Sequence, residues 1–103
     1  MTILDKIIAF KKKEVAKIKA DVPVENLVKS PLFQRDPLSL RKSLMGKGST
    51  GVIAEFKRQS PSKGIINDKT TIEEVTEGYL EANVAAQSIL TDTSFFGGTM
   101  VDL

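Results

Sequence analysis

Glu55 and Lys57 are the residues of this chain whose types and spacing best suit chemistry. They stand two residues apart in residues 52–57, a stretch that begins apolar, ends charged and is expected to form a strand. Because side chains alternate along a strand, both should share one face with Ile53 while Phe56 lies on the other. An acid and a base at the C-terminal end of a strand can hold an anionic group and manage a proton. Spacing alone fits an ordinary ion pair at a strand end equally well.

The segment after this strand supplies further groups that suit an anion. Residues 60–64 read SPSKG and offer two hydroxyls, a lysine and a conformationally free glycine, a composition that many plain loops share. The glycines of residues 46–51 match neither a Walker loop nor a dinucleotide fingerprint, and we interpret that stretch as a connector.

Composition limits the chemistry that the chain can perform. It has 103 residues, 41% of them hydrophobic and 27% charged, and it has no cysteine and no histidine. Disulfides, thiolate nucleophiles, imidazole catalysis and the usual zinc ligands are therefore absent, and no metal site is expected. A net charge of +2 is too small to indicate nucleic acid, and we interpret the lysines of residues 11–13 as the solvated face of a helix. Without a long apolar run or a secretory signal pattern, we expect a soluble cytoplasmic protein with no membrane partner.

The first half of the chain is predicted to be helical. Thr2 and Asp5 mark the start of a helix over residues 3–20, which Pro23 ends. A short helical turn over residues 24–29 should be closed by Pro31. The apolar positions of the first helix recur near a period of 3.6 and are Leu4, Ile7, Ile8, Val15 and Ile18.

A further helix is predicted to begin at Asp36-Pro37, a capping side chain followed by a proline in the first helical position. Its apolar face would be formed by three leucines, and Gly46 is a natural stop. The three leucines are Leu38, Leu40 and Leu44.

The second half is predicted to be a strand, a helix and a strand. Thr71 and Glu74 form a capping box that opens a helix through about Glu81, and Asn83 suits a left-handed C-terminal cap. Residues 85–91 form the second strand, parallel to the first through a right-handed crossover. The expected buried stripe of the helix is Ile72, Val75, Tyr79 and Leu80, and Thr99 with Asp102 resembles another helix start. Two parallel strands cannot bury both faces alone, so we expect the chain to be a truncated part of a larger α/β fold.

Three blocks together resemble the indole-3-glycerol-phosphate synthase family. Residues 54–64 (AEFKRQSPSKG) are similar to its first-strand signature, and residues 88–98 (SILTDTSFFGG) to its second strand and following loop. Residues 3–7 with residues 13–15 resemble its helical N-terminal extension. The resemblance implies an α/β fold of the (β/α)₈ TIM-barrel type. Residues 1–51 would be the helical extension and connector, and residues 52–103 the first βαβ unit with the start of the next helix.

The resemblance also implies an activity. The family is a carboxy-lyase of tryptophan biosynthesis that closes an indole ring on 1-(2-carboxyphenylamino)-1-deoxyribulose 5-phosphate, releasing carbon dioxide and water without metal or organic cofactor. By matched position, Lys57 would hold an anionic group of this phosphorylated small molecule and assist proton transfer, and Glu55 would orient and charge-balance that lysine. Ser60 would contact the substrate, Phe96 would line the pocket for the aromatic ring, and Leu90 would be a further wall.

The chain departs from the family's pattern in places. Asn83-Val84 replaces a usual Gly-Ala, and the polar Gln87 stands where an apolar residue is more usual, so its amide needs a partner. The family's principal general acid, its base and its phosphate cradle lie on later strands, beyond Leu103. We therefore expect a fragment that is inactive and self-associating on its own, from a full-length enzyme that is a monomer.

The sequence leaves two alternative functions open. One is another ribulose-phosphate-binding barrel such as phosphoribosylanthranilate isomerase, although the Ser60-Pro61-Ser62 block after Glu55 and Lys57 argues against it. The other is a non-catalytic binding or assembly module whose exposed apolar faces pair with another chain.

Overall fold

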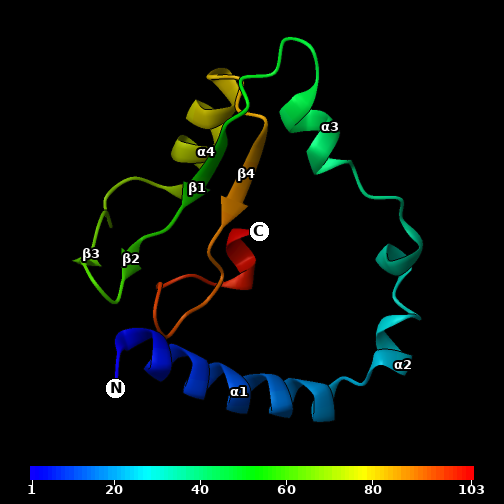
Figure 1. Ribbon diagram of the computed structural model, residues 1–103, viewed down its shortest axis with the longest axis vertical. Coiled ribbons are helices and arrows are strands. Elements are labelled where there is room, and N and C mark those ends of the chain that lie inside the picture. Colours follow the sequence, from blue (N-terminus) through cyan, green and yellow to red (C-terminus); the bar gives the residue numbers. More distant parts are fainter. The chain divides into compact units, whose positions relative to one another are not determined.

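A computed structural model describes residues 1–103 and divides them into two compact units, Met1–Leu38 and Ser39–Leu103 (Figure 1). The boundary expected between residues 51 and 52 falls inside the second unit. Helix α3 groups with the strands there, because the Ser43 hydroxyl donates to the carbonyl of Ala85 and Thr50 Oγ1 donates to the carbonyl of Asn83 at 2.9 Å.

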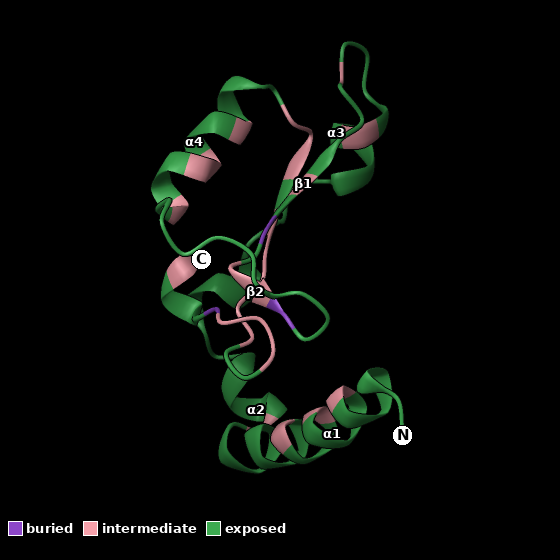
Figure 2. Ribbon diagram, turned by 90° about the vertical axis from the view of Figure 1, so that its left-hand side faces the viewer, coloured by how far each residue is buried: buried purple, intermediate pink, exposed green.

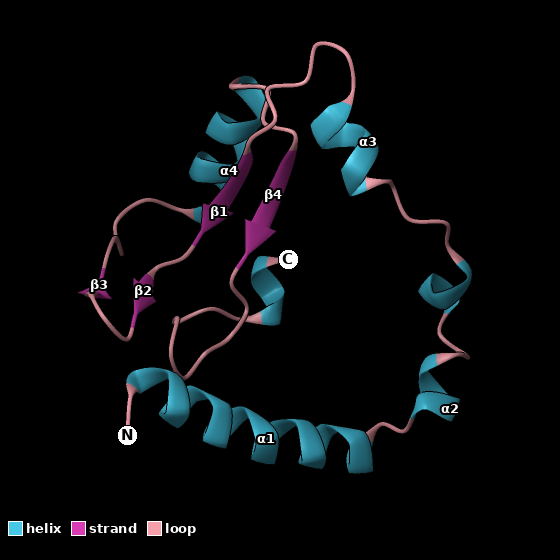
Figure 3. Cartoon of the chain, viewed as in Figure 1, coloured by secondary structure: helices cyan, strands magenta, loops and turns pink.

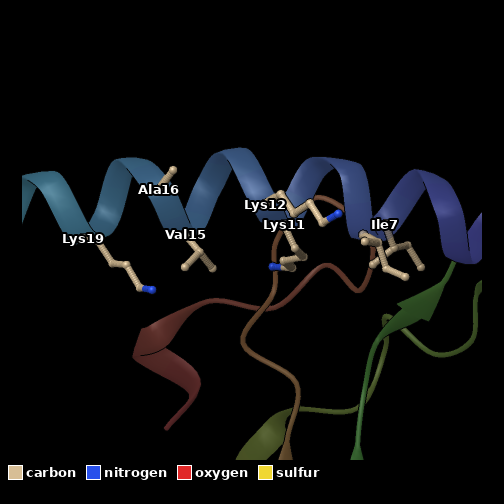
Figure 4. Close-up of a pocket in the computed structure, with 7 residues that line it drawn as sticks. Ile7, Lys11, Lys12, Val15, Ala16 and Lys19 are labelled. Carbon is tan, nitrogen blue, oxygen red and sulfur yellow. The ribbon is translucent and has the colours of Figure 1, made fainter.

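Helix α1 (Ile3–Asp21) begins at the predicted capping box. The Asp5 amide donates to Thr2 Oγ1 at 3.1 Å, and the Thr2 amide donates to Asp5 Oδ2 at 2.8 Å, so two amides that the helix leaves unpaired are satisfied. Ile7, Lys11, Val15 and Lys19 project from one face of α1 at intervals of four residues (Figure 4). No helix of the chain combines the length and the apolar character that a membrane crossing requires.

The connection after α1 is more helical than predicted. Helix α2 (Val24–Leu27) confirms the expected short turn. Pro31 was expected to close that turn, but it opens a 3₁₀ helix, η1 (Pro31–Gln34). Proline suits a first helical position because its missing amide hydrogen has no partner there in any case.

The predicted start of the next helix at Asp36-Pro37 is wrong. Helix α3 (Leu40–Met45) begins after Ser39, whose Oγ accepts a hydrogen bond from the amide of Lys42 at 3.1 Å. A serine hydroxyl with an extended backbone is an effective N-cap, so this residue, three positions later, sets the boundary. The predicted stop at Gly46 is confirmed.

Strands β1 (Ile53–Phe56) and β4 (Ala86–Ile89) pair in parallel, and helix α4 (Ile72–Glu81) connects them (Figure 3). The predicted strand, helix and strand order is confirmed, with each strand shorter than predicted. The register places Glu55 opposite Ser88 and Phe56 opposite Ile89. This α/β unit with a parallel strand pair is compatible with part of a barrel.

Helix α4 follows its predicted signals closely. Thr71 Oγ1 accepts from the Glu74 amide at 3.1 Å, and Asn83 has φ of +60°, the left-handed conformation expected of a terminating asparagine. Of the predicted buried stripe, Ile72, Val75 and Tyr79 are half-buried and Leu80 is 72% exposed, so no residue of α4 is fully buried. Gln87 has the partner that its amide needs, since Nε2 donates to the Thr76 carbonyl at 3.0 Å.

The segment between β1 and α4 contains a small hairpin that the sequence did not indicate. Strands β2 (Gln59–Ser60) and β3 (Gly64–Ile65) pair antiparallel. Beyond them, the amides of Ile66 and Asn67 both donate to the carbonyl of Arg58, at 2.8 and 3.2 Å. These hydrogen bonds hold the segment after the hairpin beside the end of β1.

Little of the chain is buried (Figure 2). Phe56, 7% exposed, is the buried hydrophobic side chain, and Ser60, 8% exposed, is the buried polar one. Ile53 on the opposite face of β1 is exposed, as the predicted alternation requires for a strand with one covered face. The chain ends in a 3₁₀ helix, η2 (Met100–Asp102), which the predicted Thr99–Asp102 capping box opens.

We predict that the isolated chain self-associates. The β1–β4 sheet has two strands and two open edges, and hydrophobic side chains such as Ile53, Ile65 and Leu80 are exposed. Open edges and apolar patches recruit partners in solution. Sedimentation velocity over a range of protein concentrations should show dimers or larger species. A monomer at every concentration, with a sharp and concentration-independent thermal transition, would contradict this prediction.

Candidate active site

The Glu55–Lys57 pair lies at the C-terminal end of β1, as the sequence predicted. Lys57 Nζ is 3.9 Å from Glu55 Oε1, and the two side chains are 38% and 47% exposed. This distance is at the limit of an ion pair, and such exposed pairs contribute little to stability. Lys57 is therefore close enough to Glu55 for charge balance and open enough to meet another anion.

Glu55 is held more firmly than Lys57. Ser88 Oγ, directly across the parallel register on β4, donates to Glu55 Oε2 at 3.1 Å. On the other side of β1, the Tyr79 hydroxyl of α4 donates to the main-chain carbonyl of Glu55 at 3.3 Å. The carboxylate thus has one oxygen on a serine and the other toward a lysine, which fixes its orientation.

A cavity of about 260 Å³ adjoins the pair. It lies between β1, the segment after the hairpin and α4, and is lined in part by Glu55, Lys57, Asn67, Thr70 and Tyr79. The polar residues of its lining carry hydroxyls, an amide and two charged groups. They suit a small polar molecule or ordered water.

Ser60 is placed by the hairpin. Its Oγ accepts from the Lys63 amide at 3.2 Å and lies 3.4 Å from Ser62 Oγ. The hydroxyl therefore organises the turn that carries it. Its predicted contact with substrate remains a prediction.

Phe96 lies in the loop after β4, which hydrogen bonds hold at both ends. Asp92 Oδ2 accepts from the amides of Phe95 at 2.7 Å and Phe96 at 3.3 Å. The Gly98 amide donates to the Asp92 carbonyl at 2.8 Å, and Thr93 Oγ1 donates to the Gly98 carbonyl at 2.7 Å. This compact loop gives Phe96 a half-buried and defined position.

Leu90 lies at the other end of the same connection. Its amide donates to the Phe56 carbonyl at 3.1 Å, which continues the β1–β4 pairing by one step beyond β4. Alternation from Ser88 places Leu90 on the Glu55 face of the sheet. The structure therefore puts Glu55, Lys57 and Leu90 on one face and carries Ser60 and Phe96 on two separate loops.

The sequence did not indicate the strongest ion pair in this region. Arg58 Nη1 and Nη2 donate to Asp102 Oδ2 and Oδ1, at 2.5 and 3.0 Å. Hydrogen bonding to Arg58 lowers the pKa of the Asp102 carboxyl and raises the pKa of Arg58, so both stay charged at neutral pH. Arg58 belongs to the block AEFKRQSPSKG and Asp102 to the predicted helix start at Thr99, but nothing in the sequence indicates that the two side chains meet.

The chain offers no obvious metal centre. No three acidic side chains come together in a group that could ligate an ion. The candidate site therefore consists of one carboxylate, one ammonium group, hydroxyls and aromatic and aliphatic walls.

The sequence of the chain is similar to proteins of one family. The family model described as indole-3-glycerol phosphate synthase matches residues 4–103. A protein of that name from Bacteroides thetaiotaomicron is 43% identical over 101 residues, which cover 98% of this chain and 38% of the relative. Relatives of the same name from Carboxydothermus hydrogenoformans and Caldanaerobacter subterraneus are 36% and 40% identical, each over 93% of this chain and over 39% and 36% of their own lengths.

The chain therefore spans well under half the length of the curated relatives that it matches. The matched residues 4–103 nevertheless include β1, α4 and β4 and all but the first residue of α1. The chain belongs to the indole-3-glycerol phosphate synthase family.

Proposed function

We propose that this chain supplies the first part of the active site of a carboxy-lyase that makes indole-3-glycerol phosphate. The family match over residues 4–103 carries the proposal, with Glu55 and Lys57 paired at the end of β1 as its structural support. In this proposal β1, α4 and β4 are the first strand, first helix and second strand of an eight-stranded (β/α)₈ barrel. The substrate is 1-(2-carboxyphenylamino)-1-deoxyribulose 5-phosphate, and ring closure releases carbon dioxide and water.

Lys57 and Glu55 have distinct roles in this proposal. The Lys57 ammonium binds an anionic group of the substrate and stabilises negative charge as it shifts during ring closure. Glu55, fixed by Ser88 at 3.1 Å, balances the charge of the ammonium and directs it along the face of the strand. No metal or organic cofactor is needed for these roles.

Three other residues form the substrate-binding walls in the proposal. Phe96 packs against the aromatic ring, with its loop held by Asp92, and Leu90 contributes an aliphatic wall on the Glu55 face. Ser60 offers its hydroxyl from the hairpin. The assembled enzyme is expected to be a monomer that acts on this small phosphorylated molecule, with neither nucleic acid nor membrane as a partner.

A chimera tests the proposal. Residues 1–103 replace the aligned 38% of the Bacteroides thetaiotaomicron relative, and the purified chimera is assayed for indole-3-glycerol phosphate beside residues 1–103 alone. We expect turnover by the chimera and none above background by the isolated chain. General acid–base groups contribute about 10²–10⁴-fold each, and in the proposal the principal ones lie outside this chain.

Two results would contradict the proposal. A folded chimera without turnover would show that this chain does not supply a competent first part of the site. Product formed by residues 1–103 alone would show that the catalytic groups are not divided as proposed. The unmodified relative, expressed in parallel, is the positive control.

A further inference from the structure

Arg58 and Asp102 form a clamp between two segments that are far apart in the sequence. Two parallel N–H···O bonds of 2.5 and 3.0 Å join the guanidinium to the carboxylate, and the guanidinium carbon lies 5.0 Å from the centroid of the Phe56 ring. The Asp102 side chain is 10% exposed and that of Arg58 is 32% exposed. Bidentate geometry, stacking and partial burial distinguish this clamp from an ordinary surface ion pair.

Asp102 has a second partner that ties the clamp to the loop carrying Phe96. Its Oδ2 also accepts from the Thr99 amide at 3.1 Å, which caps η2. Thr99 directly follows Gly98, and Gly98 closes the loop through its hydrogen bonds to Asp92 and Thr93. The position of Phe96 is therefore linked through Asp102 to the guanidinium of Arg58.

Arg58 in turn ties the clamp to the site on β1. Arg58 follows Lys57 in the chain, and its carbonyl accepts hydrogen bonds from the amides of Ile66 and Asn67. Arg58 therefore adjoins both ends of the hairpin that carries Ser60. Its guanidinium lies over the ring of Phe56, whose side chain is on the face of β1 opposite that of Glu55. Of these two consecutive cationic residues, Arg58 is paired with Asp102 and Lys57 lies at the candidate site beside Glu55.

We propose that Asp102 is a positioning residue for the reaction, acting through Arg58 to fix the Phe96 loop and the Ser60 hairpin relative to Lys57. This inference rests on the proposed function for its catalytic consequence. Its structural half, that the charge of Asp102 orders two loops at once, stands on the hydrogen bonds alone. Loss of the charge frees both loops and also releases Arg58 as a second mobile cation beside Lys57.

The test uses the active chimera with Asp102→Asn, Asp102→Glu and Arg58→Lys. Asparagine keeps the shape but loses the charge, glutamate keeps charge and fork, and lysine loses the fork and the planar stack. We expect Asp102→Asn to lower kcat/KM about tenfold, chiefly through KM, and Asp102→Glu to recover most of that loss. Arg58→Lys should lower it about as much, and the double variant no further, because both changes break one contact.

Amide hydrogen exchange provides a readout that does not depend on activity. The amides of Phe95, Phe96 and Gly98 and those of Ile66 and Asn67 should exchange faster in Asp102→Asn. Asp5→Asn is the matched control, because Asp5 makes the same capping box with Thr2 at the start of α1. It should leave exchange in both loops and KM unchanged.

The outcomes separate the two proposals. Unchanged exchange in both loops, or additive effects of the two single variants in an active chimera, would overturn this inference and leave the proposed function intact. A lower yield of folded protein with unchanged KM and kcat would show that the Arg58–Asp102 clamp only stabilises the fold, and would overturn the inference. An inactive parent chimera would contradict the proposed function and with it the catalytic half of this inference.

Discussion

Replacing Lys57 by alanine in the active chimera is expected to lower kcat by about 100-fold or more. The same change should alter the free energy of unfolding by less than about 0.5 kcal/mol. The reason lies in the different surroundings of the side chain before and after substrate binds. In the free protein its ammonium is 3.9 Å from Glu55 and 38% exposed, so removing it costs little. In the proposed function, an anionic group of the substrate would make the same ammonium a charge-assisted partner in a drier site.

Two further variants make the Lys57 result specific. Glu55→Gln should lower kcat about tenfold, because the amide keeps the shape of the side chain but loses the charge that orients Lys57. Lys69→Ala, which removes an exposed lysine from the segment before α4, should change kcat by less than about twofold. Steady-state kinetics and a urea denaturation curve for each variant are the measurements. Near-normal turnover in Lys57→Ala, or a loss of activity that unfolding explains, would show that Glu55 and Lys57 form an ordinary ion pair without a catalytic role.

Local signals in the sequence were the most reliable guides to the fold. Thr2, Thr71 and Thr99 are the N-caps at which α1, α4 and η2 begin, and Asn83 lies in the turn after α4. Each of these residues acts on backbone groups within a few positions of itself, so its effect is written in a short stretch of sequence.

The errors occurred where two local signals compete or where packing decides. Asp36-Pro37 and Ser39 are both acceptable helix starts, and the chain uses the hydroxyl of Ser39. The hairpin over β2 and β3 is missing from the prediction because strands of two residues carry too little periodicity to be recognised. Leu80 was predicted to be part of the buried stripe, but packing against the strands decides which apolar residues of α4 are covered.

In the candidate site, too, local features could be predicted from the sequence and long-range contacts could not. The shared face of Glu55 and Lys57 follows from a period of two along one strand. The contact of Ser88 with Glu55 depends on the register of two strands that are 33 residues apart, and the Arg58–Asp102 clamp joins residues 44 apart. Such pairings are products of the assembled fold, and a single sequence does not contain them.

Gly98 is the position where a one-carbon change should do most damage to the fold. A Cβ on Gly98 would clash with the Leu90 carbonyl oxygen and lie 2.8 Å from the Leu90 carbonyl carbon and 3.0 Å from Thr91 Cα. These are backbone atoms at the end of the β4 ladder and cannot move aside as the tip of a flexible side chain can. The segment is also held by the Gly98 amide on Asp92 and the Gly98 carbonyl on Thr93, so the glycine cannot retreat without breaking both bonds.

Gly98→Ala in the chimera is therefore expected to reduce the free energy of unfolding by about 2–4 kcal/mol and to lower kcat/KM by displacing the Phe96 loop. Gly78→Ala is the matched control, because Gly78 lies within α4 and a Cβ there has no neighbour within 4 Å. That change should stabilise the protein by about 0.5–1 kcal/mol through the better helix propensity of alanine. Urea denaturation of the two variants beside the parent measures both effects. If Gly98→Ala proves as stable as the parent, the close packing of the Phe96 loop on the end of β4 is wrong, and with it the defined position of Phe96 in the proposed site.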